Sequence, residues 1–180
     1  MIAIIGKYGV GKTTFLKKVE SFGYKILYTD EFFANCYKFN NSCYWAIKNE
    51  LGQNYVNESE VIKNELRNFI LKDKNNINIL EKIVYPILEK HLEENRYDFV
   101  EIPNIFSKNA NFERFFSHIF NIKTSEKKRQ ENIEKKGVLK KNSNLNNSLN
   151  VGKIKKKVVD ILWEDIEKED FFINFFKSLN

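Results

Sequence analysis

The sequence has little of what secreted and membrane-embedded proteins require. It contains only two cysteines, Cys36 and Cys43, which are too few for a disulfide framework and lack the spacing of a metal site. No apolar run approaches the length of a membrane span, and the apolar N-terminus lacks the basic leader of a signal peptide. We therefore expect a cytoplasmic protein without a membrane partner, in which both cysteines are reduced thiols.

The chain is also too short for two full domains. Its 180 residues suffice for one sizeable domain with small excursions. The net charge of +6 could indicate a nucleic-acid partner. However, Lys, Asn, Ile, Phe and Tyr are abundant together, as A/T-rich codon usage would produce, and no single element carries a basic stripe interleaved with aromatic residues. We expect a monomer that binds small molecules rather than nucleic acid.

A glycine-rich loop stands near the start of the chain, in the stretch MIAIIGKYGVGKTTFLKKVESFG. Its residues Gly6, Gly11, Lys12 and Thr13 fit the pattern G-x-x-x-x-G-K-[ST], with an apolar run before them and an amphipathic pattern after them. A helix N-terminus offers unpaired N–H groups and the positive end of the helix dipole, so this loop is predicted to bind phosphate. The alternative is an ordinary strand-to-helix turn, which the order of strand, loop, Lys-Thr and helix disfavours.

The residue types of the loop indicate ATP and Mg²⁺ as cofactors. Lys12 would bring a point charge to the outer phosphates and is predicted to be catalytic, while the hydroxyl of Thr13 is a predicted Mg²⁺ ligand. Gly9 and Gly11 are expected to adopt backbone angles that a residue with Cβ would resist. The predicted ATP-binding residues are Gly6, Gly9, Val10, Gly11, Lys12, Thr13 and Thr14.

Strand-like and helix-like segments alternate along the chain. Short apolar runs predict five strands, at residues 1–6, 24–30, 97–103, 118–124 and 158–164. Helical patterns occupy residues 13–22, 59–72, 76–94, 125–137 and 169–179. This alternation predicts an α/β fold of the P-loop NTPase type, a three-layer α/β/α arrangement around a five-stranded parallel sheet, with the ligand crevice at the carboxyl ends of the strands.

We expect residues 1–180 to form a single kinase domain with a core at 1–39 and 97–180. The long helical crossover at about 40–96 is expected to form a helical insertion that binds the phosphate acceptor, because it is longer than a simple crossing of the sheet needs. A small lid is expected at about 125–150, where the chain is polar, basic and poor in periodicity. Lys136 and Lys140 could close over the ATP phosphates there, although a lysine run is also typical of solvated surface.

Beyond the loop, five further stretches resemble the motifs of the dephospho-CoA kinases. Members of that family have a strand ending in D-A-D, an F-G pair, a helix with L-E-x-I-x-H-P, a strand ending in P-L-L-F-E and a helix with Q-x-x-R-x-x-x-R. This chain has, in the same order, ILYTDEFFA, LG, LEKIVYP, VEIPNIFS and SEKKRQENIEKKG. The resemblance implies a kinase that transfers the γ-phosphoryl group of ATP to the ribose 3′-hydroxyl of dephospho-CoA.

The chain departs from these motifs at several positions. Tyr28 replaces the first Asp of D-A-D, Tyr85 replaces the His of H-P, and Ser107 replaces the final Glu of P-L-L-F-E. The two lid arginines correspond to Asn132 and Lys136, or to positions one residue away. Phosphate contacts at these last positions would lack the bidentate geometry of arginine.

The resemblance assigns further site residues. Asp30, the second Asp of D-A-D, would be catalytic and bind the acceptor by accepting or orienting its hydroxyl proton; a helix N-cap is the alternative role. Tyr85 and Pro103 would line the substrate pocket, with simple packing as the alternative for Tyr85. Glu101 would hold Mg²⁺ opposite Thr13, unless it is a strand-end charge facing solvent.

Two other functions stay open at this stage. Another nucleotide or nucleoside kinase would share the loop and the lid, but it would be expected to present arginines around a base or a second phosphate. A catalytically degenerate P-loop protein that only binds nucleotide is the other alternative. In such a protein the loop sequence would be expected to depart from its motif as the other stretches do, and here the loop motif is intact.

Overall fold

The structure, a computed structural model, describes residues 1–102, 104–135 and 154–179. Its internal contacts divide the chain into two compact units. The sheet unit comprises Met1–Tyr28, Tyr97–Phe106 and Phe116–Asn180, and the helical unit comprises Thr29–Arg96 and Ser107–Phe115. The helical unit therefore includes the region expected as an insertion and also takes in the segments 29–39 and 107–115.

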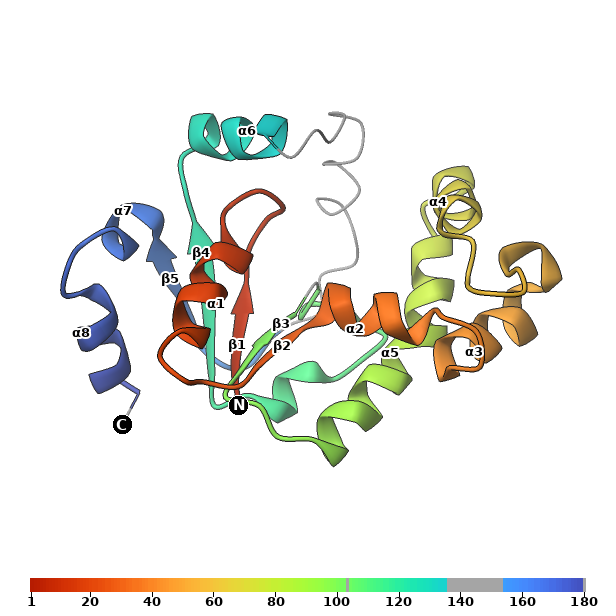
Figure 1. Ribbon diagram of the computed structural model, residues 1–180, viewed down its shortest axis with the longest axis horizontal. Helices are drawn as coiled ribbons and strands as arrows, with labels where there is room; N and C mark the ends of the chain where they lie inside the picture. Colours follow the sequence, from red (N-terminus) through yellow and green to blue (C-terminus); the bar gives the residue numbers. More distant parts are fainter. Residues whose placement is uncertain (103, 136–153, 180) are drawn as a thin grey trace. The chain divides into compact units, whose positions relative to one another are not determined.

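The sheet unit contains the five predicted strands, which form one parallel sheet in the order β2-β3-β1-β4-β5 (Figure 1). The strands are β1 Ile2–Ile5, β2 Ile26–Tyr28, β3 Phe99–Glu101, β4 His118–Lys123 and β5 Val158–Leu162. A parallel strand that is buried on both faces is apolar throughout, which is why the β1 sequence shows no alternation with polar residues. The predicted α/β fold with a five-stranded parallel sheet is confirmed.

One face of this sheet packs against the helices α1, Lys12–Glu20, and α8, Phe171–Lys177. Phe15 of α1 stacks on Phe172 of α8 with ring centroids 5.7 Å apart. The buried cluster on this face includes Ile4, Leu16, Val19, Phe99, Phe120 and Phe175. Residues that alternate with them along the strands, Ala3, Val100 and Ile119, are fully buried as well. The sheet unit also contains α6, Glu126–Lys135, and α7, Trp163–Ile166.

The helical unit consists of four α-helices and two short 3₁₀ helices among the residues that the structure describes. The α-helices are α2 Thr29–Cys36, α3 Ser42–Leu51, α4 Lys63–Lys72 and α5 Asn76–Glu94; the 3₁₀ helices are η1 Gln53–Tyr55 and η2 Phe112–Phe115. The helix predicted at 76–94 has these bounds, whereas α4 begins later than predicted because Val61 pairs with Val56 in an isolated β-bridge. None of the described helices combines the length and the hydropathy needed to cross a membrane.

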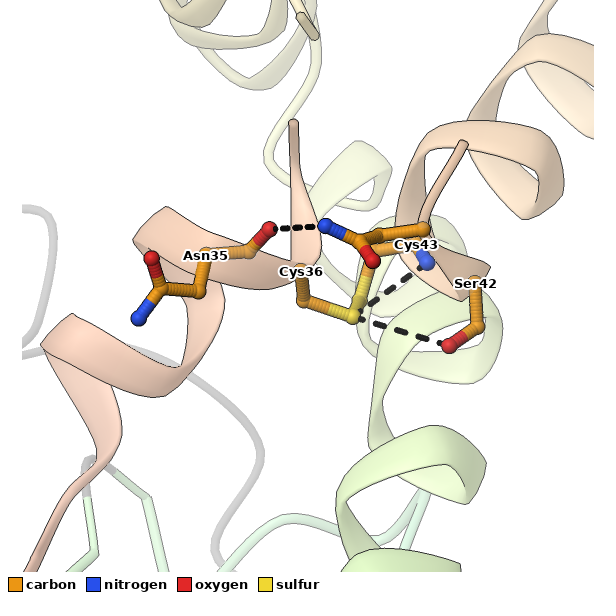
Figure 2. The surroundings of a disulfide bond; sticks show 5 residues. Asn35, Cys36, Ser42 and Cys43 are labelled. Atoms are coloured by element: carbon orange, nitrogen blue, oxygen red, sulfur yellow. Dashed lines mark hydrogen bonds between the residues drawn. A yellow bond between two sulfur atoms is a disulfide. The ribbon is translucent and has the colours of Figure 1, made fainter. Parts of the chain in front are cut away.

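The expectation of two separate thiols is wrong, because the structure joins Cys36 and Cys43 in a disulfide (Figure 2). Cys36 ends α2 and Cys43 lies in the first turn of α3, and their Cα atoms are 5.1 Å apart. The turn between the helices includes Asn40 at a φ of 69°, a conformation that asparagine tolerates better than most residues. The side chain of Asn41 donates to the carbonyl of Asn35 at 2.7 Å, which helps to close the turn. The pairing depends on this turn geometry, which the spacing of the cysteines did not reveal.

Reduction of this disulfide should destabilise the protein by about 2–3 kcal/mol, because it frees a short loop in the unfolded chain. The cysteines are 7 residues apart, so the loop is at the short end of the range over which disulfides stabilise. Urea denaturation with and without a phosphine reductant measures the difference. The double variant Cys36→Ser, Cys43→Ser is the control, and its midpoint should not respond to the reductant. Equal midpoints for the oxidised and reduced protein would contradict the prediction.

Candidate active site

The predicted phosphate loop, residues 6–11, leaves the central strand β1 and leads directly into α1. Gly11 is the N-cap residue of this helix, and its carbonyl accepts the first intrahelical hydrogen bond from the amide of Phe15 at 2.9 Å. The first N–H groups of a helix have no intrahelical acceptor. The start of α1 therefore offers the amides of Lys12, Thr13 and Thr14 to an anion.

The glycines of the loop are required by its backbone and by its neighbours. Gly9 and Gly11 have φ values of 87° and 100°, in the left-handed region that favours glycine. A Cβ at Gly9 would lie 2.7 Å from Cγ1 of Ile133 in α6, and one at Gly11 would lie 2.6 Å from Cζ3 of Trp163 in α7. Both helices thus approach the loop too closely for a side chain at these positions.

Lys12 folds back over its own loop. Its Nζ donates to the carbonyl of Gly6 at 3.0 Å and to that of Lys7 at 3.4 Å. The same Nζ lies 3.6 Å from Oε1 of Glu101, and the two side chains are only 14% and 10% exposed. Glu101 ends β3 and is in register with Ile4 of β1, which brings its carboxylate to the loop end of the sheet. An ammonium and a carboxylate, both largely shielded from solvent, therefore lie beside the predicted phosphate site.

The other predicted loop residues differ in exposure. Val10 is buried at 3% exposure, Thr13 is half-buried, and Thr14 is exposed in the first turn of α1. Tyr28, which ends β2, directs its hydroxyl to Oε2 of Glu20 in α1 at 3.2 Å. This departure from the D-A-D motif thus ties the second strand to the helix that follows the loop.

Two side chains of α6 donate hydrogen bonds to the carbonyls of the loop. Nη1 of Arg129 donates to the carbonyl of Tyr8 at 3.1 Å, and Nδ2 of Asn132 donates to that of Gly9 at 2.9 Å. Arg129 is only 7% exposed, and its Nε and Nη2 also donate to the carboxylate of Glu126. These hydrogen bonds, together with one from Gln130, lower the pKa of Glu126 to about 2. Arg129 was not among the predicted site residues, although it is the one arginine in the helical pattern 125–137.

Asp30 lies in the helical unit, inside the first turn of α2, and it is exposed. Because α2 begins at Thr29, Asp30 is not the residue that precedes the helix, and the N-cap alternative is disfavoured. A carboxylate in the first turn still interacts favourably with the helix dipole.

A buried polar cluster in the helical unit centres on Glu81 of α5, which is 5% exposed. Its carboxylate accepts hydrogen bonds from Ser107 at 2.6 Å, Asn109 at 2.8 Å and Tyr85 at 3.2 Å. Burial, followed by the neighbouring charge of Glu81, raises the pKa of Tyr85, so its hydroxyl stays protonated and acts as the donor. The predicted pocket residue Tyr85 is therefore engaged, through its hydroxyl, with a buried carboxylate.

Three predicted site residues, Pro103, Lys136 and Lys140, lie outside the described residues. The structure accordingly describes the expected lid only as far as Lys135, the last residue of α6. Within the described ranges, no group of three or more His, Cys, Asp and Glu side chains is arranged to hold a metal ion by itself. A Mg²⁺ ion at this site would therefore need phosphate oxygens or water in addition to protein ligands.

Comparison with known protein families gives a match to the model described as dephospho-CoA kinase, over residues 1–151. The match includes the loop, the whole helical unit and the sheet unit as far as residue 151, so β5, α7 and α8 lie beyond it. The chain belongs to the dephospho-CoA kinase family. The family resemblance inferred from the sequence motifs is thereby confirmed.

Individual relatives cover different shares of the chain. A dephospho-CoA kinase of Mycoplasma genitalium is 35% identical over 89 residues, which make up 49% of this chain and 45% of that protein. A dephospho-CoA kinase of Mycoplasma pneumoniae is 24% identical over 145 residues, covering 77% of this chain and 72% of that protein. The chain thus aligns with about half the length of the first relative.

Two solved structures share the fold across almost the whole chain. A crystal structure of a protein from Thermus thermophilus matches with a TM-score of 0.70 and 20% identity, covering 99% of this chain and 95% of that one. The dephospho-CoA kinase from Campylobacter jejuni matches with a TM-score of 0.55 and 16% identity, covering 99% and 96%. At such identities the likeness shows the fold alone, and it supports the predicted α/β fold with a parallel sheet.

Two departures from the family motifs meet in the Glu81 cluster. The motifs would place a histidine at position 85 and a glutamate at position 107, next to the retained Glu81. Tyr85 and Ser107, which occupy these two positions, both donate hydrogen bonds to the carboxylate of Glu81.

Removing these donors should destabilise the protein. Ser107→Ala should cost about 1–3 kcal/mol, because a buried carboxylate loses a donor. Tyr85→Phe should cost less, since its hydrogen bond to Glu81 is longer, 3.2 Å against 2.6 Å. Urea denaturation provides the comparison, with Ser59→Ala, at an exposed hydroxyl, as the matched control. If Ser107→Ala were no less stable than Ser59→Ala, the cluster would not contribute as inferred.

Proposed function

We propose that this protein transfers the γ-phosphoryl group of ATP to the ribose 3′-hydroxyl of dephospho-CoA. The observation that carries the proposal is that a member of this family retains a complete phosphate loop at the end of the central strand. Phosphoryl transfer has a loose transition state, so catalysis consists mainly of positioning and electrostatic stabilisation. The helix N-terminus behind Gly11 and the charge of Lys12 are suited to both.

Lys12 is the proposed electrostatic catalyst. Its ammonium group now rests on two main-chain carbonyls and beside Glu101. Phosphate oxygens are charged acceptors and bind an ammonium more strongly than neutral carbonyls do. ATP would therefore draw Nζ toward the outer phosphates, while Gly6, Gly9, Val10, Gly11, Thr13 and Thr14 supply the backbone around them.

Thr13 and Glu101 are the proposed protein ligands of the Mg²⁺–ATP complex. A hydroxyl and a carboxylate are hard oxygen donors of the kind that Mg²⁺ prefers, and Glu101 is held at the loop end of the sheet by its register with β1. When bound, the ion would neutralise charge that develops on the phosphates. The ion pair with Lys12 shows that this carboxylate already lies beside a cation at the loop end of the sheet.

Asp30 is the proposed base that accepts or orients the proton of the 3′-hydroxyl. The family resemblance supports this role, and the position of Asp30 inside α2 disfavours the alternative role as an N-cap. Tyr85 and Pro103 are proposed to line the acceptor pocket, with Tyr85 contributing its ring because its hydroxyl is engaged with Glu81. Lys136 and Lys140 are proposed to belong to a lid over ATP.

The proposed substrates also bear on where the protein acts and on its partners. ATP and dephospho-CoA are small molecules, and we propose that the protein acts on them as a cytoplasmic monomer without a nucleic-acid or membrane partner. The domain organisation proposed is a single kinase domain in which the helical insertion binds the acceptor.

A coupled assay of ADP release against a panel of acceptors tests the function. We expect ADP release with dephospho-CoA and not with nucleosides or nucleoside monophosphates, and mass spectrometry should detect the 3′-phosphorylated product. Lys12→Ala is the matched variant, and its rate should fall by about 10²-fold or more with an unchanged circular dichroism spectrum. Turnover of a nucleoside or nucleotide instead would favour a nucleotide kinase, and ATP binding without any turnover would favour a binding module.

Substitution of Asp30 tests the proposed base. Asp30→Asn keeps the size of the side chain but cannot accept a proton, so the rate should fall by ~10²- to 10⁴-fold while ATP affinity changes little. Glu31→Gln is the matched control, because Glu31 is the other exposed carboxylate in the first turn of α2. Both variants lose the same interaction with the helix dipole. Similar turnover in the two variants would remove Asp30 from the mechanism.

A further inference from the structure

The contacts between α6 and the phosphate loop are made with the main chain of the loop. Arg129 donates to the carbonyl of Tyr8 at 3.1 Å and Asn132 to that of Gly9 at 2.9 Å. The fit is close, because a Cβ at Gly9 would lie 2.7 Å from the Ile133 side chain and 3.1 Å from the Arg129 carbonyl. The helix therefore fixes the orientation of two successive peptide groups in the loop.

Fixing a carbonyl also fixes the amide on the other side of the same peptide. In a planar trans peptide the C=O and the following N–H point in opposite directions. When Arg129 holds the carbonyl of Tyr8 toward α6, the N–H of Gly9 points away from α6. In the next peptide, Asn132 holds the carbonyl of Gly9 while the N–H of Val10 donates to Lys7 at 3.4 Å, inside the loop. Of these two amides, that of Gly9 is the one turned outward for an anion.

The charge of Arg129 is directed to a different partner. Its Nε and Nη2 donate to the two carboxylate oxygens of Glu126 at 2.9 and 2.7 Å, a bidentate arrangement that leaves Nη1 for Tyr8. A guanidinium held in this fork has a fixed plane, and its charge is compensated by the carboxylate. Arg129 is thus arranged to orient the loop backbone rather than to bind phosphate directly.

We propose that Arg129, aligned by Glu126, is a positioning residue for ATP: it holds the Tyr8–Gly9 peptide so that the Gly9 amide faces the triphosphate. Asn132 secures the following peptide. The inference rests on the proposed function, in which the loop binds ATP. Glycine has the widest backbone freedom of any residue, so without this hold the Gly9 peptide would sample other orientations and ATP binding would have to order it.

Titration calorimetry of the full chain with ATP, in the absence of acceptor, tests the proposal. Arg129→Gln should weaken ATP binding by about tenfold, the equivalent of one hydrogen bond to a charged donor. Arg129→Lys should weaken it nearly as much, because lysine keeps the charge but loses the planar fork. Lys128→Gln, at an exposed lysine of the same helix, removes the same charge and should leave the affinity unchanged.

Glu126→Gln separates positioning from direct phosphate contact. If Arg129 acts through Tyr8, the loss of its aligning carboxylate should weaken ATP binding even though the protein gains positive charge. If Arg129 bound phosphate itself, releasing it from Glu126 would strengthen binding, and that result would overturn the proposal. Full rescue by Arg129→Lys would overturn it as well.

Two further measurements keep the result interpretable. In Arg129→Gln the amide resonance of Gly9 should broaden before ATP is added, and the KM for ATP should rise while kcat stays within about twofold. A sharp, unshifted Gly9 resonance in the variant would contradict the proposal even if the variant were less stable. If Arg129→Gln bound ATP with the same affinity as the wild-type protein, only this inference would be overturned. If the wild-type protein bound no ATP, the proposed function and this inference would both be overturned.

Discussion

A backbone that is to surround an anion must turn amides inward and find donors for the carbonyls that it turns outward. In this loop, four consecutive carbonyls have such donors: those of Gly6 and Lys7 accept from Lys12, that of Tyr8 from Arg129 and that of Gly9 from Asn132. The donors come from the start of α1 and from α6, which follow two different strands. The close packing of α6 around Gly9 can be understood from this requirement, because the two donors from α6 must reach the main chain of the loop.

The parts that could be predicted from the sequence are those encoded locally. Short, mainly apolar runs predicted all five strands; the run is continuous in the central strand β1, which is buried, and polar residues interrupt it in β4 and β5. The spacing from Gly6 to Thr13 predicted the loop. The disulfide, Arg129 and the Glu81 cluster were missed because each joins residues whose proximity depends on the turns and packing between elements. The roles of Asp30 and Glu101 remain predictions, as they depend on bound substrates.

The departures from the family motifs are satisfied in the described parts of the chain, each by a specific contact. Tyr28 reaches Glu20, Tyr85 and Ser107 share Glu81, and Asn132 reaches the loop itself. A polar replacement in a buried network is tolerated when donors and acceptors still match, and is costly when they do not. At these four positions the replacing side chains therefore have hydrogen-bond partners within the described residues.

The contact between Trp163 and Gly11 has a practical consequence. The chain has two tryptophans, and each unit contains one: Trp163 lies against the loop in the sheet unit, and Trp45 lies on α3 in the helical unit. Their indole rings differ in setting, since Trp163 donates to Glu167 at 2.9 Å and Trp45 is covered on one side by the ammonium of Lys48. Replacing either ring with phenylalanine leaves a chain with a single tryptophan, so tryptophan fluorescence, excited selectively over the tyrosines, can follow each unit separately without an attached dye.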